Sequence, residues 1–208
     1  ESASKHVTGR AQYLDDIPEW PDMLHLATAG AEVACALIEH IDTDAARRAP
    51  GVVDIITQAD IPGSADVSPV FSGDLLLAGE RVDYVGQPIV AVAAISLEAA
   101  RRACALVKIR YRAQEPRLSV QEALTREEFV LPTHTLTNGD AGTAITKADH
   151  QLQNEIYLRG QEHFYLEGQI SIAVPNEDGG VRVQSSSQHP AEVQKLVAQV
   201  LGVPLHLV

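Results

Sequence analysis

The chain has 208 residues, of which 45% are hydrophobic and 21% charged, and its formal net charge is −12 at pH 7. This composition is that of a folded globular protein and excludes a disordered chain. The acidic excess argues against a nucleic-acid partner, because neutralising phosphates requires clustered Lys and Arg. No stretch is apolar for long enough to span a membrane, and the polar start at residues 1–5 is not a signal peptide.

Strands and short helices are predicted to alternate over the first part of the chain. Apolar runs predict strands over 23–27, 34–41 and 52–57. A short helix over 43–49 precedes the third strand and ends at Pro50 and Gly51. Prolines and glycines recur between residues 60 and 73, so we expect a surface connection there.

A strand, a helix and another strand are predicted between residues 88 and 112. The segment 88–95 is almost entirely apolar, which is typical of a strand covered on both faces. Ser96 can cap a helix that continues toward Val107, and Glu98 is favourable in its first turn. From Val107 to Arg112 apolar and basic residues alternate, which predicts a half-exposed strand.

Residues 113–150 have a different character, because prolines and glycines interrupt every apolar run. We interpret them as a linker between two domains. From Gln151 we expect a second domain, with strands over 170–174 and 181–184 joined by a turn. Pro190 then opens a helix at its first position, and Gly202 ends it. The predicted fold class is therefore α+β.

The two termini indicate a piece of a longer protein. The first residue is not Met, and residues 203–208 form an apolar run that we interpret as part of a buried strand. A natural carboxyl terminus rarely lies inside such a strand, so we expect the chain to be a truncated fragment.

Two cysteines, Cys35 and Cys104, cannot form the disulfide framework of a small secreted domain. Each lies between two alanines, so we interpret both as buried, reduced thiols rather than as metal-binding or redox residues. A reducing, cytoplasmic location fits this pattern best.

Common catalytic motifs are absent from the sequence: it has no Gly-rich phosphate loop, no Cys-x-x-Cys pair, no His-Glu-x-x-His and no Gly-x-Ser-x-Gly. His163 and Glu167 have a spacing that could bring two metal ligands together on a helix. The apolar residues between them favour a strand or an irregular segment instead. We therefore interpret His163 as a hydrogen-bonded structural residue, and we assign no catalytic and no metal-binding residue in this chain.

A polar run between the predicted hairpin and the last helix, residues 185–190, is the strongest candidate site. Strand-to-helix junctions direct side chains and N–H groups into a crevice, where polar or anionic ligands bind. Alternatively, Ser187 or His189 caps the helix and Gln188 faces water. The pattern by itself favours capping and leaves both interpretations open.

Five motifs in chain order resemble the large subunit of the xanthine dehydrogenase and aldehyde oxidase family. Segments 9–17, 49–52 and 85–89 resemble its small amino-terminal domain, the α/β hammerhead. Segment 161–167, and Gln188 with 201–204, resemble the opening of the molybdopterin-binding domain that follows. Two positions depart from the family pattern, because Cys35 stands near a position where His is commoner and Gly168 replaces a usual Pro or Thr.

The resemblance implies an α+β fold with a hammerhead domain over 1–112, an interdomain linker over 113–150 and the truncated start of a mixed α+β molybdopterin-binding domain over 151–208. It also implies a chemistry. In this family a molybdenum-bound hydroxide derived from water attacks an electron-poor carbon, hydride passes to a sulfido ligand and a glutamate acts as base. Of the residues around the cofactor, only the glutamine that matches Gln188 lies in this chain, where its amide would hydrogen-bond an oxo ligand of molybdenum.

The resemblance further implies what the chain lacks. A Gly-rich loop and the catalytic glutamate would follow Val208, so the fragment alone is predicted to bind no molybdopterin cofactor and to be inactive. The 2Fe-2S centres and FAD are expected on partner subunits, and the substrate is expected to be a purine or an aldehyde. The alternative is a non-catalytic assembly or scaffold module with the hammerhead fold. A different small-molecule-binding α+β protein would require all five matches to be accidental.

Overall fold

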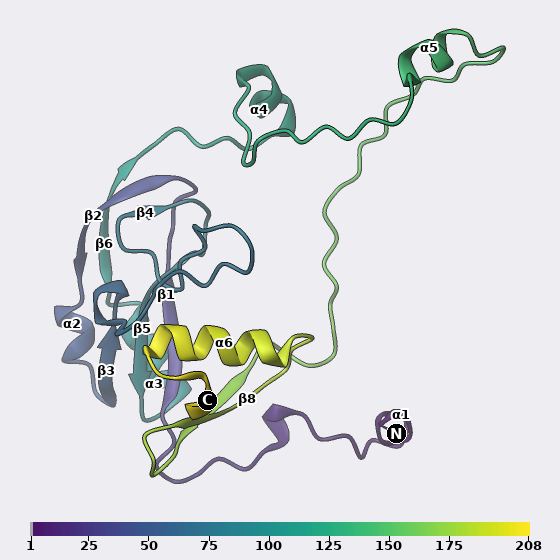
Figure 1. The fold of residues 1–208 in the computed structure, drawn as a ribbon. Coiled ribbons are helices and arrows are strands. Elements are labelled where there is room, and N and C mark those ends of the chain that lie inside the picture. The colour runs from purple at the N-terminus through teal and green to yellow at the C-terminus, as the bar shows by residue number, and fades with distance from the viewer. Residues whose placement is uncertain (1) are drawn as a thin grey trace. The chain divides into compact units, whose positions relative to one another are not determined.

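The computed structural model describes residues 2–208, which divide into two compact units (Figure 1). The larger unit combines the residues up to 116 with residues 167–208, and the smaller unit contains residues 117–166. Within residues 2–208, no helix has the length and apolar character needed to cross a membrane.

The core of the larger unit is built around β5 (Pro88–Ala94), the middle strand of an antiparallel sheet. β1 (His25–Gly30) pairs with one edge of β5, and β3 (Val52–Ile56) pairs with the other. Ile89, Val90 and Val92 have no exposed surface, so both faces of β5 are covered. The prediction of a fully buried strand from its apolar sequence is confirmed.

A second antiparallel sheet has β2 (Ala36–Asp42) between β4 (Arg81–Val82) and β6 (Lys108–Ala113). Exposed and half-buried residues alternate along β6, as predicted. β5 and β6 follow each other in sequence across one helix, yet they lie in different sheets. One hydrophobic cluster joins the two sheets, and its largest buried members are Ile55, Val82, Ile89, Val90 and Val92.

The helix between these strands, α3 (Leu97–Cys104), begins at the predicted cap. The Ser96 hydroxyl accepts a hydrogen bond from the Ala99 N–H at 3.2 Å. The buried side chains of α3 are all alanines, and the helix packs against β1 and β5. Because alanine side chains are small, the helix can approach the sheet closely.

Ser96→Ala is expected to lower the free energy of unfolding by about 1 kcal/mol, because a first-turn N–H of α3 loses its partner. Urea denaturation of the chain measures this change. Ser72→Ala is the matched control, since Ser72 is exposed and no hydrogen bond of its side chain occurs among residues 2–208. Equal stability losses in the two variants would contradict the capping role.

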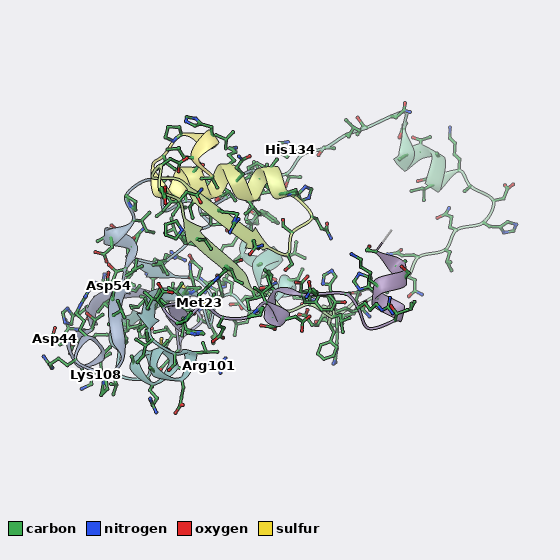
Figure 2. All side chains as sticks on the ribbon, turned by 90° about the horizontal axis from the view of Figure 1, so that it is seen from below. Met23, Asp44, Asp54, Arg101, Lys108 and His134 are labelled. Carbon is green, nitrogen blue, oxygen red and sulfur yellow. The ribbon has the colours of Figure 1, made fainter. Side chains whose placement is uncertain are left out.

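Several shorter elements differ from their predictions. β1 begins two residues later than expected and extends to Gly30. α2 (Asp44–Arg47) is shorter than the predicted helix, and its Arg47 forms an ion pair with Asp54 of β3 at 3.5 Å. Asp44, the first residue of α2, and Asp54 are labelled in Figure 2. α1 (Ala3–Val7) and β4 were not predicted, because elements this short have no measurable periodicity.

After the second unit, the chain returns as a hairpin and a helix, as predicted. β7 (Ser171–Pro175) and β8 (Val181–Ser185) pair antiparallel, and α6 (Pro190–Leu201) follows with Pro190 at its first position. Gly202 ends the helix with φ 66°, a left-handed conformation that favours glycine. The prediction of a buried strand over 203–208 is wrong. Leu205–Leu207 is a 3₁₀ helix, and the Gln194 side chain binds the carbonyls of Leu205 and Val208.

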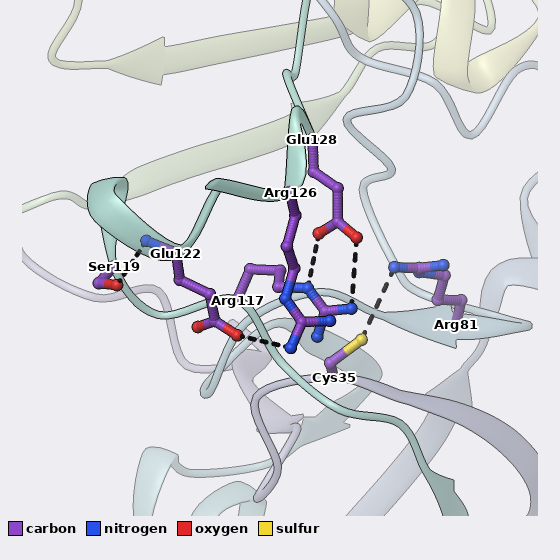
Figure 3. Close-up of polar contacts among 7 residues, drawn as sticks. All are labelled: Cys35, Arg81, Arg117, Ser119, Glu122, Arg126 and Glu128. Carbon is purple, nitrogen blue, oxygen red and sulfur yellow. Dashed lines mark hydrogen bonds and ion pairs between the residues drawn. The ribbon is translucent and has the colours of Figure 1, made fainter. Parts of the chain in front are cut away.

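The smaller unit, residues 117–166, contains two short helices, α4 (Val120–Arg126) and α5 (Ala141–Thr146), and none of its residues is buried. Ser119 and Asp140 cap these helices. Arg117 pairs with Glu128, and Arg126 pairs with Glu122 (Figure 3). The segment predicted as a linker therefore holds two capped helices, which are stabilised by local contacts rather than by a core.

Candidate functional site

The junction between β8 and α6 consists of four residues, 186–189, between Ser185 and Pro190. The hydroxyl groups of Ser171 and Ser185 are 2.9 Å apart and hydrogen-bonded, which ties the two strand ends together. The Ser187 hydroxyl accepts a hydrogen bond from the His189 N–H at 3.0 Å. These contacts fix the path of the chain into α6.

The helix-capping alternative is only partly right. His189 occupies the cap position of α6, but its side chain makes no capping hydrogen bond. Ser187 binds the N–H of His189 rather than one from the first turn. Within residues 2–208 no side chain caps the first turn of α6, and the N–H groups of Glu192 and Val193 donate to the His189 carbonyl at 3.0 and 3.1 Å.

Gln188 lies in the middle of this junction. Its side chain is exposed, and it forms no hydrogen bond with the other residues between 2 and 208. Both the amide N–H groups and the carbonyl of Gln188 are therefore available to a ligand. The carboxamide is neutral, so it can donate a hydrogen bond without adding charge to a site.

A pocket of about 310 Å³ lies beside the junction, and Gln188 is not part of its lining. Strand β8 and the first turns of α6 supply most of the wall, together with the last residue of the chain. No acidic or basic side chain lines it. The lining residues are Val183, Ser185, Ser187, Pro190, Ala191, Val193, Gln194 and Val208.

Glu167, half of the possible metal pair, has a structural role instead. Its carboxylate Oε1 accepts a hydrogen bond from the Leu14 N–H at 3.2 Å, at the start of a 3₁₀ helix, Leu14–Asp16. His163 is exposed and forms no hydrogen bond with the described residues, so the structural bond expected of it is not seen. Across residues 2–208, no group of three or more His, Cys, Asp or Glu side chains could hold a metal ion.

The motif at 85–89 begins with a tight turn. Gly86 has φ 86°, and Gln87 is a buried polar residue whose Oε1 accepts the Asp83 N–H at 2.8 Å. A Cβ on Gly30 would lie 2.7 Å from the carbonyl oxygen of Gly86, so two glycines meet where β1 leaves β5. The contacts of this motif therefore support the fold.

Both cysteines are free thiols, as predicted, but each is half-buried rather than buried. Burial raises the pKa of the Cys104 thiol, which keeps it protonated. Cys35 Sγ lies 3.6 Å from an Arg81 guanidinium nitrogen (Figure 3).

Family models match nearly the whole chain. Residues 8–115 match the model described as "Aldehyde oxidase and xanthine dehydrogenase, a/b hammerhead domain", and residues 122–208 match the molybdopterin cofactor-binding domain. Six residues, 116–121, lie between the two matches, close to the boundary between the two compact units at residue 116.

Individual proteins are similar over the same range. Xanthine dehydrogenase/oxidase of Gallus gallus is 37% identical and aldehyde oxidase 2 of Macaca fascicularis is 39% identical, over 98% and 99% of this chain. The chain spans 15% of the length of each of these relatives. The solved structure of aldehyde oxidoreductase from Desulfovibrio gigas superposes with a TM-score of 0.82 at 27% identity, over 99% of this chain and 25% of that one.

Proposed function

This chain belongs to the aldehyde oxidase and xanthine dehydrogenase family, and from that premise we propose that it forms part of the molybdenum-binding subunit of a hydroxylase. The proposed reaction oxidises a purine or an aldehyde with oxygen taken from water. One observation carries the proposal: the free amide of Gln188 stands on a fixed strand-to-helix junction inside the segment that matches the cofactor-binding model.

The hydrogen-bond donor at the junction, the Gln188 amide, is chemically suited to contact the cofactor. Gln188 is exposed, neutral and bound to no other described residue, so its amide can donate to an oxygen ligand of the molybdenum without first breaking a protein contact. When bound, the molybdopterin cofactor supplies the redox chemistry and the transfer of oxygen from water. Gln188 would orient and stabilise the bound group by donating a hydrogen bond from its amide.

The proposal also assigns roles to the rest of the chain and to its partners. In the proposal, residues 1–112 form the hammerhead domain, 113–150 connect the domains, and 151–208 open the cofactor-binding domain. Iron–sulfur and FAD-binding partner subunits carry the electrons away, and the enzyme works in the cytoplasm. Because this chain contributes one cofactor contact, residues 1–208 alone bind no molybdenum and are inactive.

Elemental analysis tests the proposed function. We expect stoichiometric molybdenum in the purified complete subunit and none in the 208-residue chain expressed alone. Stoichiometric molybdenum in the isolated chain would contradict the division of the site. A complete subunit that folds but holds no molybdenum would instead indicate the scaffold module, and that gene would lack a Gly-rich loop followed closely by Glu after Val208.

A further inference from the structure

The carboxyl end of α6 is held by a loop that contains residues 63–66, more than 130 positions earlier in the sequence. The N–H groups of Gly63 and Ser64 donate to the carbonyls of Val200 and Gln199, at 2.9 and 3.0 Å. In return, the Gln199 side-chain amide donates to the Asp66 carbonyl at 3.0 Å. These five residues are called the α6 clasp below.

The clasp provides hydrogen-bond donors for carbonyls at the end of α6. The last carbonyls of an α-helix have no partner within the helix, so they are bound by water, by a cap or by another segment. The N–H groups of Gly202 and Val203 donate to the Ala198 carbonyl. The only N–H group among residues 2–208 that donates to the Val200 carbonyl from outside the helix is that of Gly63, in the loop. The carboxyl end of α6 is therefore bonded to the hammerhead part of the larger unit.

Gly63 is required by the space available. A Cβ on this residue would lie 2.0 Å from the Gln199 carbonyl oxygen and 2.8 Å from the Gly202 nitrogen. Both obstructing atoms belong to backbone, so a side-chain movement cannot relieve the clash. Gly63 is not among the glycines with positive φ, which leaves close approach as the reason for glycine here.

The loop that carries the clasp is ordered around one carboxylate. Asp66 accepts hydrogen bonds from the N–H groups of Ser68 and Gly73, at 2.9 and 3.0 Å, and the Ser64 hydroxyl accepts from the Asp66 N–H. The bonds from Ser68 hold the pKa of the Asp66 carboxyl below its usual value, so it stays charged at neutral pH. Hydrogen bonds within the loop therefore hold Ser64 and Asp66 in the conformation that contacts α6.

We propose that the α6 clasp is a positioning device for Gln188. α6 has 12 residues, so a helix about 18 Å long connects the clasp at one end to the junction at the other. A helix fixed at its carboxyl end presents the loop at its amino end in one orientation. This inference rests on the proposed function of Gln188, and Gly63 acts through that residue without touching the cofactor.

Gly63→Ala in the complete subunit tests the proposal, with Gly168→Ala as the matched control. The control makes the same chemical change where a new Cβ meets no atom within 4 Å and φ is not positive. We expect faster hydrogen exchange of α6 amides in Gly63→Ala only. We also expect kcat to fall on the order of tenfold, because small misplacements are costly, with KM unchanged. If Gly63→Ala fails to fold, Gln199→Ala replaces it in the test, because this change adds no volume. We expect Gln199→Ala to lower kcat by less than Gly63→Ala, again with KM unchanged.

A double variant separates positioning from general support. If the clasp acts through Gln188, Gly63→Ala should cause no further loss of kcat in a Gln188→Ala background. The same loss in both backgrounds would overturn the positioning role. Failure of the proposed function would look different, because Gln188→Ala itself would then leave turnover unchanged.

Discussion

Ile89→Ala is expected to lower the free energy of unfolding of the chain by about 2–5 kcal/mol. Ile89 is fully buried in β5, the central strand, and belongs to the cluster that joins the two sheets. Removing its side chain leaves a cavity between layers that are fixed by strand pairing on both sides of β5, so the surroundings relax only partly. Chemical denaturation monitored by circular dichroism measures the loss.

Ile95→Ala provides the control for this change, because Ile95 follows β5 directly and is 66% exposed. The same deletion there should cost about 0.5 kcal/mol or less. If the two variants lost equal stability, β5 would not be the centre of the core.

Local sequence signals were sufficient to predict the elements around this core. The apolar run of β5, the serine before α3 and the Pro190 to Gly202 frame of α6 each determine their own element. The chain end shows the limit of this approach. Residues 203–208 have the composition of a buried strand, yet the 3₁₀ helix forms because Gln194, more than two turns earlier in α6, binds its carbonyls.

Part of the candidate site could likewise be predicted from local sequence, and part could not. The position of the strand-to-helix junction could be predicted, because a polar run between a hairpin and a proline-initiated helix is a local pattern. The availability of Gln188 could not, since Ser187 and His189 were equally plausible caps before their bonds were known. The bonds from Leu14 to Glu167 and from Gln199 to Asp66 join residues more than a hundred positions apart, and no local pattern signals them.

Gln188→Ala in the complete subunit is expected to lower the turnover number by about 10–100-fold, the usual cost of removing a hydrogen bond that supports a metal centre. Because Gln188 is exposed and makes no bond to other described residues, the free energy of unfolding should change by about 0.5 kcal/mol or less. Gln188→Glu should be at least as harmful, since it replaces a neutral donor with a negative charge.

Gln184→Ala is the matched control for this experiment. Gln184 lies on β8, four residues before Gln188, is also exposed and makes no side-chain hydrogen bond within residues 2–208. The proposed role of Gln188 predicts no loss of turnover in this variant. The control thereby separates a contact with the cofactor from any general effect of removing a surface amide.

The turnover number per bound molybdenum, compared between Gln188→Ala and Gln184→Ala, is the most direct test of the assigned site. We predict a value about 10–100-fold lower for Gln188→Ala, at unchanged stability. Equal turnover in the two variants, at equal molybdenum content, would contradict the assignment of Gln188 to the cofactor.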